Sequence, residues 1–346
     1  MYAISPNPAN RARLLGRFAW FAVFYNLLVI LWGALVRASG SGAGCGNHWP
    51  LCNGQVIPVS PSVHTLIEFT HRMMTGGSAF VVLGLLVWTF RATVRGHAAR
   101  AFAVVSTILL INEALLGALL VKLGYVTGNQ SAGRMVLLSV HLSNTLLLMA
   151  ALTLTARFLS AGWGIRFWGW ARLHQVNGFC WALGGLAATI GVGVSGSMAA
   201  LGDTLFPASS LHAAFAQDFA GNSPWLLRLR LVHPASALVA AVFVIWLVER
   251  SSRPNVSEGG MKEDSDGGAM RARLASTVLI LLGLQFALGV ADVFLLAPAW
   301  MQLLHLLGAD VYWVALVLLA AEVLWPDEYS SPEVELHPTV ATTTGA

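Results

Sequence analysis

The sequence predicts an all-α integral membrane protein whose eight transmembrane helices form two pseudo-symmetric four-helix bundles. Composition is the first of three observations that lead to this fold class. The 346 residues are 56% hydrophobic and 10% charged, with a mean hydropathy of +0.69, whereas roughly 25% of the residues of a soluble domain are charged. The other two observations are apolar runs of membrane-spanning length and a set of histidines that repeats between the halves of the chain.

The apolar runs predict segments of about 20 residues, the length that crosses a bilayer as a helix. The runs are continuous, whereas the strands of a membrane barrel would show short stretches of alternating hydrophobicity. We therefore expect helices that lie in a lipid bilayer. The eight predicted segments cover approximately residues 14–36, 69–90, 101–123, 135–157, 174–197, 225–248, 272–295 and 300–324.

Lysine and arginine residues predict how these helices are oriented. Fourteen of the 20 lie at one set of segment ends, which should therefore be cytoplasmic. Both termini would then be cytoplasmic, and the long loops at 37–68 and 198–224 would face outward. Because topology accounts for the basic residues, the net charge of +4 does not imply a nucleic-acid partner.

The start of the chain contains no short apolar core followed by a small-residue cleavage site. We expect it to be a cytoplasmic lead into the first helix rather than a removable signal. This lead is also too short for an organelle transit peptide. Together these features favour the plasma membrane of a bacterium.

An internal repeat divides the chain into two halves of four helices. Each half crosses the membrane an even number of times, so both insert in the same orientation, related by an axis along the membrane normal. The predicted domains are an N-terminal half (1–160), a C-terminal half (161–325) and a disordered cytoplasmic tail (326–346). Two pairs of stretches carry the repeat: GALVRASGSG (33–42) with GVGVSGSMAA (191–200), and NEALLGALL (112–120) with LQFALGVAD (284–292).

Four histidines, His71, His141, His233 and His305, lie near the outer ends of segments 2, 4, 6 and 8. The step from His71 to His233 is 162 residues, and the step from His141 to His305 is 164. Histidine is costly inside a bilayer unless something engages it, and paired imidazoles commonly hold a haem iron from both sides. The pattern predicts a redox or haem-handling membrane protein with one histidine pair per half. The alternative is that the halves share only hydropathy and the histidines lie at helix ends by chance.

Two cysteines, Cys45 and Cys52, lie in the first outer loop. Because that loop faces an oxidising space in the predicted topology, we expect a disulfide bond between them. The two cysteines would form either a structural clip that stiffens the loop or a redox-active pair that exchanges electrons.

Glu68, His71 and Arg72 follow one another at i, i+3 and i+4, so on a helix they share one face. A carboxylate at this depth must be paired, solvated or used. Arg72 can pair with Glu68, which is the structural interpretation. In the functional interpretation, Glu68 accepts protons or stabilises charge beside a reactive haem edge.

Further polar residues are candidates for supporting roles. Five arginines lie near the outer surface, where haem propionates would point in such a bundle. They could bind those propionates, or their side chains could simply extend to the membrane interface. They are Arg37, Arg72, Arg134, Arg228 and Arg230. Five polar residues inside segments could form hydrogen bonds to the histidines, although helix packing explains them equally well: Asn112, Glu113, Gln285, Asp292 and Asp310.

The run LVRASGSGAGCGNHWPLCNGQVIP (35–58), followed by IEFTHRMMTG (67–76), resembles the haem A synthase family, in the bacterial form with a cysteine pair in the first outer loop. The resemblance implies an enzyme that oxidises the C8 methyl group of haem O to a formyl group. The product is haem A for terminal oxidases. Haem O would be the substrate, and haem O synthase and a terminal oxidase assembly pathway would be partners.

The resemblance also implies a role for each histidine pair. By position, His233 and His305 would ligate a cofactor haem b in the C-terminal half. His71 and His141 would ligate or line the substrate-haem site of the N-terminal half, with Arg72 beside them and Glu68 as the catalytic residue. The halves depart from strict repetition, because His71 precedes an arginine whereas His233 precedes a proline.

Two other functions are compatible with the residues. A di-haem membrane cytochrome that only transfers electrons would use the same four histidines, but it would not need Glu68 or the long outer loop. A transporter built from parallel repeats would instead have Gly- or Pro-broken helices around a site at the membrane midplane.

Overall fold

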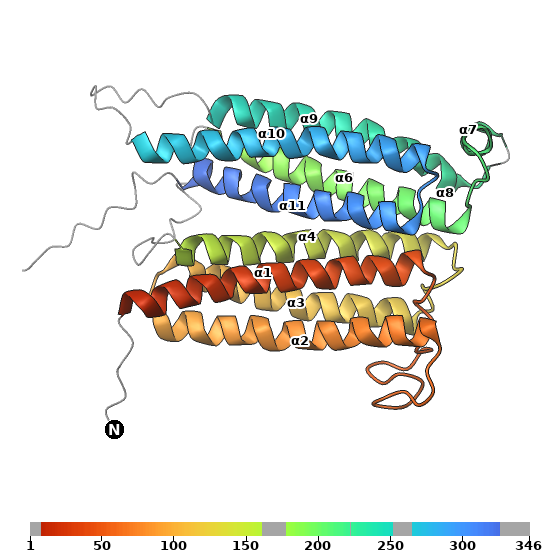
Figure 1. The fold of residues 1–346 in the computed structure, drawn as a ribbon, viewed down its shortest axis with the longest axis horizontal. Coiled ribbons are helices and arrows are strands. Elements are labelled where there is room, and N and C mark those ends of the chain that lie inside the picture. The colour runs from red at the N-terminus through yellow and green to blue at the C-terminus, as the bar shows by residue number, and fades with distance from the viewer. Residues whose placement is uncertain (1–7, 161–177, 222, 252–264, 326–346) are drawn as a thin grey trace, which may run out of the picture.

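The chain folds into long antiparallel helices (Figure 1). The computed structural model describes residues 8–160, 178–221, 223–251 and 265–325. Within these ranges the regular structure is helical, apart from one bridge between Cys52 and Gln55. Eight helices of the described ranges are long and apolar enough to cross a membrane, so the chain is a multi-pass membrane protein. The predicted all-α fold class is confirmed.

Four long helices come from each half of the chain. The first four are α1 (Pro8–Ala38), α2 (Val63–Ala92), α3 (Ala98–Lys122) and α4 (Ala132–Ser160). The other four are α6 (Phe179–Leu205), α9 (Val232–Ser251), α10 (Ser265–Phe294) and α11 (Ala299–Leu324). Figure 1 shows each set grouped together, with α1 and α4 facing α11. The domain boundary at residue 160 stays a prediction, because residues 161–177 and the predicted tail 326–346 lie outside those described.

The two halves meet where α4 packs against α11. Trp313 and Leu316 of α11 are fully buried there, and the indole Nε1 of Trp313 donates a hydrogen bond of 2.8 Å to the carbonyl of Leu146 in α4. Further along the same two helices, Arg157 pairs with the buried Glu322 at 2.6 Å. Apolar packing and a paired buried charge therefore hold α4 and α11 together.

Most of the helices extend past the predicted apolar segments, because polar residues continue them. Helix α2 begins at Val63, whereas the predicted segment starts at residue 69. The hydroxyl of Ser62 caps this start by accepting a hydrogen bond of 3.2 Å from the backbone N–H of Thr65, which satisfies a donor that the helix itself cannot pair. The early start places Glu68 inside the helix, one turn before the first histidine.

The sixth predicted segment is interrupted near its outer end. Helix α8 (Trp225–Arg228) leads through a 3-10 turn, η1 (Leu229–Leu231), into α9 at Val232. Pro234 therefore lies in the first turn of α9, where a missing backbone N–H costs no helical hydrogen bond. The proline marks a late helix start and does not kink the interior of a helix.

The connection 39–62 and the short helices α7 (Leu211–Phe219) and α8 lie at one end of the molecule, opposite the start of α1 (Figure 1). We call this the outer end, in keeping with the predicted topology. The connection 39–62 leads into α2, which carries His71, and the connection with α7 and α8 leads into α9, which carries His233. Both connections can therefore cover a histidine site.

Candidate functional site

Each of the four predicted histidines lies against a glycine of the long helix that precedes its own. A Cβ atom added to these glycines would lie between 2.9 and 3.9 Å from Cε1 of the imidazole. At Gly33 and Gly196 this distance is 3.0 and 2.9 Å, so the ring occupies space that another side chain would need, whereas at Gly117 and Gly289 it is 3.9 and 3.4 Å, an ordinary van der Waals contact. We call these four glycines the glycine seats. The pairs are Gly33 with His71, Gly117 with His141, Gly196 with His233, and Gly289 with His305.

The glycine seats revise one of the two repeat alignments. Matching 33–42 with 191–200 places Gly33 opposite Gly191, but nothing lies within 4 Å of a Cβ added at Gly191. The structural equivalent is Gly196, five residues later, and that part of the predicted repeat was wrong. The other alignment, which pairs Gly117 with Gly289, is confirmed.

In the C-terminal half, the structure brings His233 and His305 together. Their ring centres lie 6.3 Å apart, and the ring planes are nearly perpendicular at 85°. A metal bound about 2 Å from one nitrogen of each ring would separate the ring centres by about 6 Å. The spacing and the donor type of this pair therefore fit one iron held between two imidazoles.

In the N-terminal half, His71 of α2 lies against Gly33 of α1, and His141 of α4 lies against Gly117 of α3. Both keep a buried Nδ1 atom without a hydrogen-bond partner among the described residues, as does His305. In His233, Nδ1 lies 3.2 Å from the hydroxyl of Ser195. Buried polar atoms without partners are rare in folded proteins, so these rings have binding capacity that the described residues do not use.

Beside His71, Glu68 is buried, with 4% of its surface exposed. Its Oε1 pairs with Nη2 of Arg72 at 2.6 Å, and its Oε2 accepts a hydrogen bond of 2.8 Å from the backbone N–H of Cys45. Arg72 also donates through Nη1 to the carbonyls of His48 and Leu51, both at 2.6 Å. Glu68 and Arg72 thus fasten the first outer loop to helix α2.

The first outer loop is closed by the predicted disulfide between Cys45 and Cys52. Its start is pressed against helix α2, where the hydroxyl of Thr65 donates a hydrogen bond of 2.9 Å to the carbonyl of Gly44. A Cβ at Gly44 would collide with the backbone of His64, so this close approach requires glycine. We call the loop, together with Glu68 and Arg72, the outer clamp.

The second outer loop is held differently. Arg230 stands three residues before His233, the position that Glu68 has relative to His71. Its guanidinium lies 3.0 Å from a carboxylate oxygen of Asp203 and 3.5 Å from one of Asp218, and it donates to the carbonyl of Phe206 at 3.0 Å. Partial burial raises the pKa of Asp218 in α7, and Arg230 opposes that rise. Arg230 therefore anchors the loop that follows α6.

A second carboxylate lies beside the other histidine of the N-terminal half. Glu113 of α3 has Oε1 3.4 Å from Nδ1 of His141 in α4. The side-chain amide of Asn144 donates to Oε2 of Glu113 at 2.5 Å, and the hydroxyl of Thr145 donates to Oε1. Asn112 donates to Asn144 at 2.7 Å. Of the five polar residues predicted to support a histidine, Glu113 alone reaches one among the described contacts.

The five outer arginines all donate hydrogen bonds to protein oxygens. Arg37 bridges the halves, because it donates to the hydroxyl of Thr204 at 3.3 Å and to the side-chain carbonyl of Gln302 at 3.0 Å. Arg134 and Arg228 each donate to a backbone carbonyl of an outer connection. Their contacts hold loops and helix ends together, a use that sequence position alone did not reveal.

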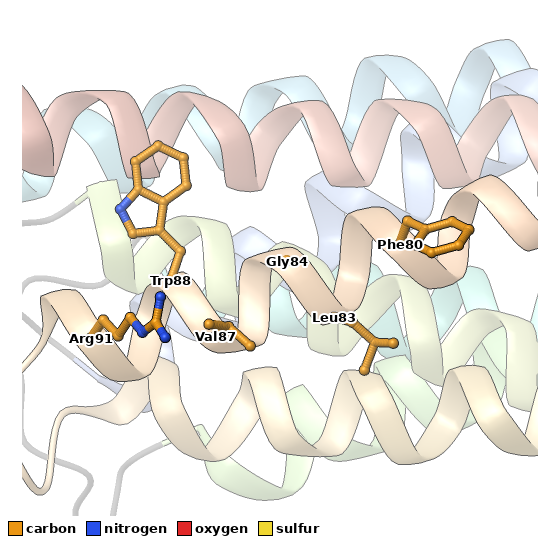
Figure 2. Close-up of a pocket in the computed structure, with 6 residues that line it drawn as sticks. All are labelled: Phe80, Leu83, Gly84, Val87, Trp88 and Arg91. Carbon is orange, nitrogen blue, oxygen red and sulfur yellow. The ribbon is translucent and has the colours of Figure 1, made fainter.

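A shallow groove of about 440 Å³ runs along α2 (Figure 2). Helix α2 alone lines it, and its lining includes Phe80, Trp88 and Arg91. These residues follow His71 by more than two turns and extend toward the end of α2 away from the outer end. None of the predicted site residues lines this groove, so it lies apart from the histidine sites.

Comparison with known proteins identifies relatives of this chain. A protein of Thermus thermophilus named Protoheme IX farnesyltransferase is 41% identical over 325 residues, which cover 94% of this chain and 50% of that protein. Heme A synthase from an Exiguobacterium species is 33% identical over 145 residues, covering 42% of this chain and 46% of the relative. Heme A synthase from Shouchella clausii is 39% identical over 131 residues, with 38% and 41% covered.

The chain spans about half the length, or less, of these curated relatives. A family model described as cytochrome oxidase assembly protein matches residues 16–317. That match runs from α1 into α11 and includes all four histidines with their glycine seats. The chain therefore belongs to the COX15-CtaA family of cytochrome oxidase assembly proteins.

Proposed function

We propose that this protein makes haem A by oxidising the C8 methyl group of haem O to a formyl group. The observation that carries the proposal is that each of four histidines lies against a glycine seat, with the ring centres of His233 and His305 6.3 Å apart. The family and the relatives named Heme A synthase support the same activity. The outer clamp fastens a disulfide-closed loop beside His71 alone among the described histidine sites, which supports a substrate site there.

We assign a haem b cofactor to His233 and His305, whose 6.3 Å ring separation fits one iron. Within the described residues, no cluster of three or more His, Cys, Asp or Glu side chains could hold a metal ion. Each site therefore rests on two imidazoles. If His233 and His305 hold it, haem b would supply one-electron transfer there.

In the N-terminal half, His71 and His141 would bind the substrate haem, and Arg72 would lie at its edge. Glu68 is one turn from His71 on the same face of α2, and we propose that it accepts protons as the methyl group is oxidised. The hydrogen bonds that it accepts from Arg72 and from the backbone N–H of Cys45 fix its position. They also support the structural interpretation, in which Glu68 only anchors the loop.

The membrane context and partners extend this proposal. Haem O would be supplied by an enzyme that farnesylates protohaem, because the chain aligns with half of a relative named Protoheme IX farnesyltransferase. Haem A would pass to a terminal oxidase assembly pathway. We propose a bacterial plasma membrane as its location, and the distribution of 14 of 20 basic residues supports a topology with both termini cytoplasmic.

A di-haem cytochrome that only transfers electrons is the second candidate. The equivalence of the glycine seats in the two halves favours it, since both halves would then bind haem in the same way. This candidate gives no role to Glu68 or to the outer clamp.

Haem extraction after expression beside a haem O source separates the candidates. A haem A synthase should yield haem A or its hydroxylated precursor in the extracted pigment. If the protein binds haem but leaves haem O unconverted in the presence of a reductant and oxygen, it is a cytochrome. If it is colourless, neither function holds.

A further inference from the structure

Glu113 is an ionisable residue in the interior of a membrane-spanning helix, α3 (Ala98–Lys122). Such a residue is costly in a bilayer and normally serves a site. The proposed reaction gives Glu113 no role. Its surroundings are nevertheless specific, because the side chains of Asn144 and Thr145 on α4 both donate hydrogen bonds to it. Two donors from one turn of α4 hold the carboxylate against that helix.

The same turn of α4 lies directly after His141. Nδ1 of His141 is buried and has no hydrogen-bond partner among the described residues, and the atom that faces it is Oε1 of Glu113 at 3.4 Å. A carboxylate oxygen can accept two hydrogen bonds, so Oε1 can accept from Nδ1 in addition to Thr145. We propose that Glu113 is a positioning residue that accepts a hydrogen bond from Nδ1–H of His141 and so leaves Nε2 free to bind the iron of the substrate haem.

Glu113 differs from the residues that lie at the other histidine sites. Gln285 occupies the equivalent position in the C-terminal half, since both residues stand four before a glycine seat. The partner of His233 is the neutral hydroxyl of Ser195 at 3.2 Å. Among the described residues, His141 is the one seated histidine with a carboxylate oxygen within 4 Å of a ring nitrogen. Within the described part of the chain, a carboxylate acceptor is therefore specific to the proposed substrate half.

A carboxylate that accepts the second N–H of a ligand imidazole fixes the tautomer and makes the ring a stronger base. A more basic ligand stabilises the ferric state, so it lowers the reduction potential of the haem that it binds. This inference rests on the proposed function, because it requires haem at His71 and His141. The expected consequence is a lower potential and tighter haem binding in the N-terminal half than a neutral acceptor would give.

The test is Glu113→Gln, which installs the residue that the C-terminal half has at this place. The haem of the N-terminal half is observed in a His305→Ala background, and ferric protohaem is the probe. We expect the midpoint potential of that haem to shift upward and its affinity to fall by about 10- to 100-fold. An unchanged potential with haem still bound would overturn the inference.

Thr145→Val keeps the carboxylate and removes its competing donor, so Oε1 becomes a better acceptor for His141. We expect the potential to shift downward, opposite in sign to Glu113→Gln. If Glu113 only packs helices, both variants should lower stability together and leave the potential unchanged. Thr145→Val also decides the matter if Glu113→Gln fails to fold.

Failure of the proposed function gives a different result. A wild-type protein that takes up no haem at either histidine pair would remove both proposals. A wild-type protein that binds haem in both halves, with potentials unaffected by Glu113→Gln and Thr145→Val, would remove only the role of Glu113.

Discussion

The two halves of the molecule share the same arrangement of histidines and glycine seats, but they differ in the charged residues near the histidines. Each half seats two histidines against glycines of neighbouring helices. In the N-terminal half a carboxylate lies near each histidine, Glu68 near His71 and Glu113 near His141. In the C-terminal half the position of Glu68 is taken by Arg230, and the position of Glu113 by a neutral glutamine.

This difference indicates how a repeated bundle can divide two tasks. A bis-imidazole site that only passes electrons needs two ligands at a suitable ring separation, and the separation of His233 and His305 fits the cofactor site that we propose there. A site that oxidises a methyl group must also move protons, and carboxylates are the groups in this chain suited to that work. We therefore place the chemistry in the N-terminal half, although the histidines alone would not distinguish the halves.

The largest expected effect on this comparison comes from Glu68→Gln, which keeps the shape of the side chain and removes its charge. If Glu68 moves protons, the variant should fold and retain haem while its haem A yield falls by about 100-fold or more. The measurement is haem extraction, normalised to folded protein.

Glu322→Gln is the matched control, because it also takes the carboxylate from an arginine, Arg157, but far from the histidines. Breaking a buried ion pair costs about 3 to 5 kcal/mol, so both variants should lose stability. Only Glu68→Gln should lose haem A yield per folded molecule. Equal yields from the two variants would leave Glu68 as a loop anchor.

The glycine seats provide the next test. Gly196→Ala places a methyl group 2.9 Å from Cε1 of His233, which is too close for the ring to stay in place. We expect haem occupancy in the C-terminal half to fall about tenfold, by analogy with other substitutions that disturb a ligand's orientation. Absorption of the low-spin haem relative to protein measures it.

Gly191→Ala is the control for that variant, since the added methyl group meets nothing within 4 Å. Alanine is a better helix former than glycine by up to about 1 kcal/mol, so this variant should bind haem as the wild type does and be at least as stable. Equal haem loss in both variants would mean that the seats do not hold the ligands.

The smallest expected effect belongs to the disulfide of the outer clamp. Replacing Cys45 and Cys52 together by serine should lower the free energy of unfolding by about 2 kcal/mol, because Glu68 and Arg72 still hold the loop. As a clip, the bond should affect haem A yield only through stability. Abolished yield at an unchanged melting temperature would instead indicate thiol chemistry.

Much of the fold followed from the sequence because membrane helices leave a direct signal. Apolar runs located the eight membrane-length helices of the described residues. The i, i+3, i+4 spacing placed Glu68, His71 and Arg72 on one face, where Glu68 and Arg72 indeed pair. Helix ends were less accurate, since capped polar turns such as the one at Ser62 extend beyond the apolar runs.

The glycine seats were missed for a different reason. A seat depends on how closely two helices approach, and local similarity placed Gly191 where packing selects Gly196. Contacts between distant residues were equally hidden: neither the bridge from Arg37 to Gln302 nor the anchoring of a loop by Arg230 follows from sequence spacing. The distance of 3.4 Å between His141 and Glu113 depends on how α3 packs against α4, so it could not be predicted from the sequence.

The most direct test of the division between the halves is to identify the haems retained by two variants expressed beside a haem O source. His233→Ala should lose haem B and keep haem O in the N-terminal half. His71→Ala should keep haem B and lose haem O and haem A. If both variants lose the same haem, or if His233→Ala still makes haem A at the wild-type level, the assignment of cofactor and substrate to separate halves is contradicted.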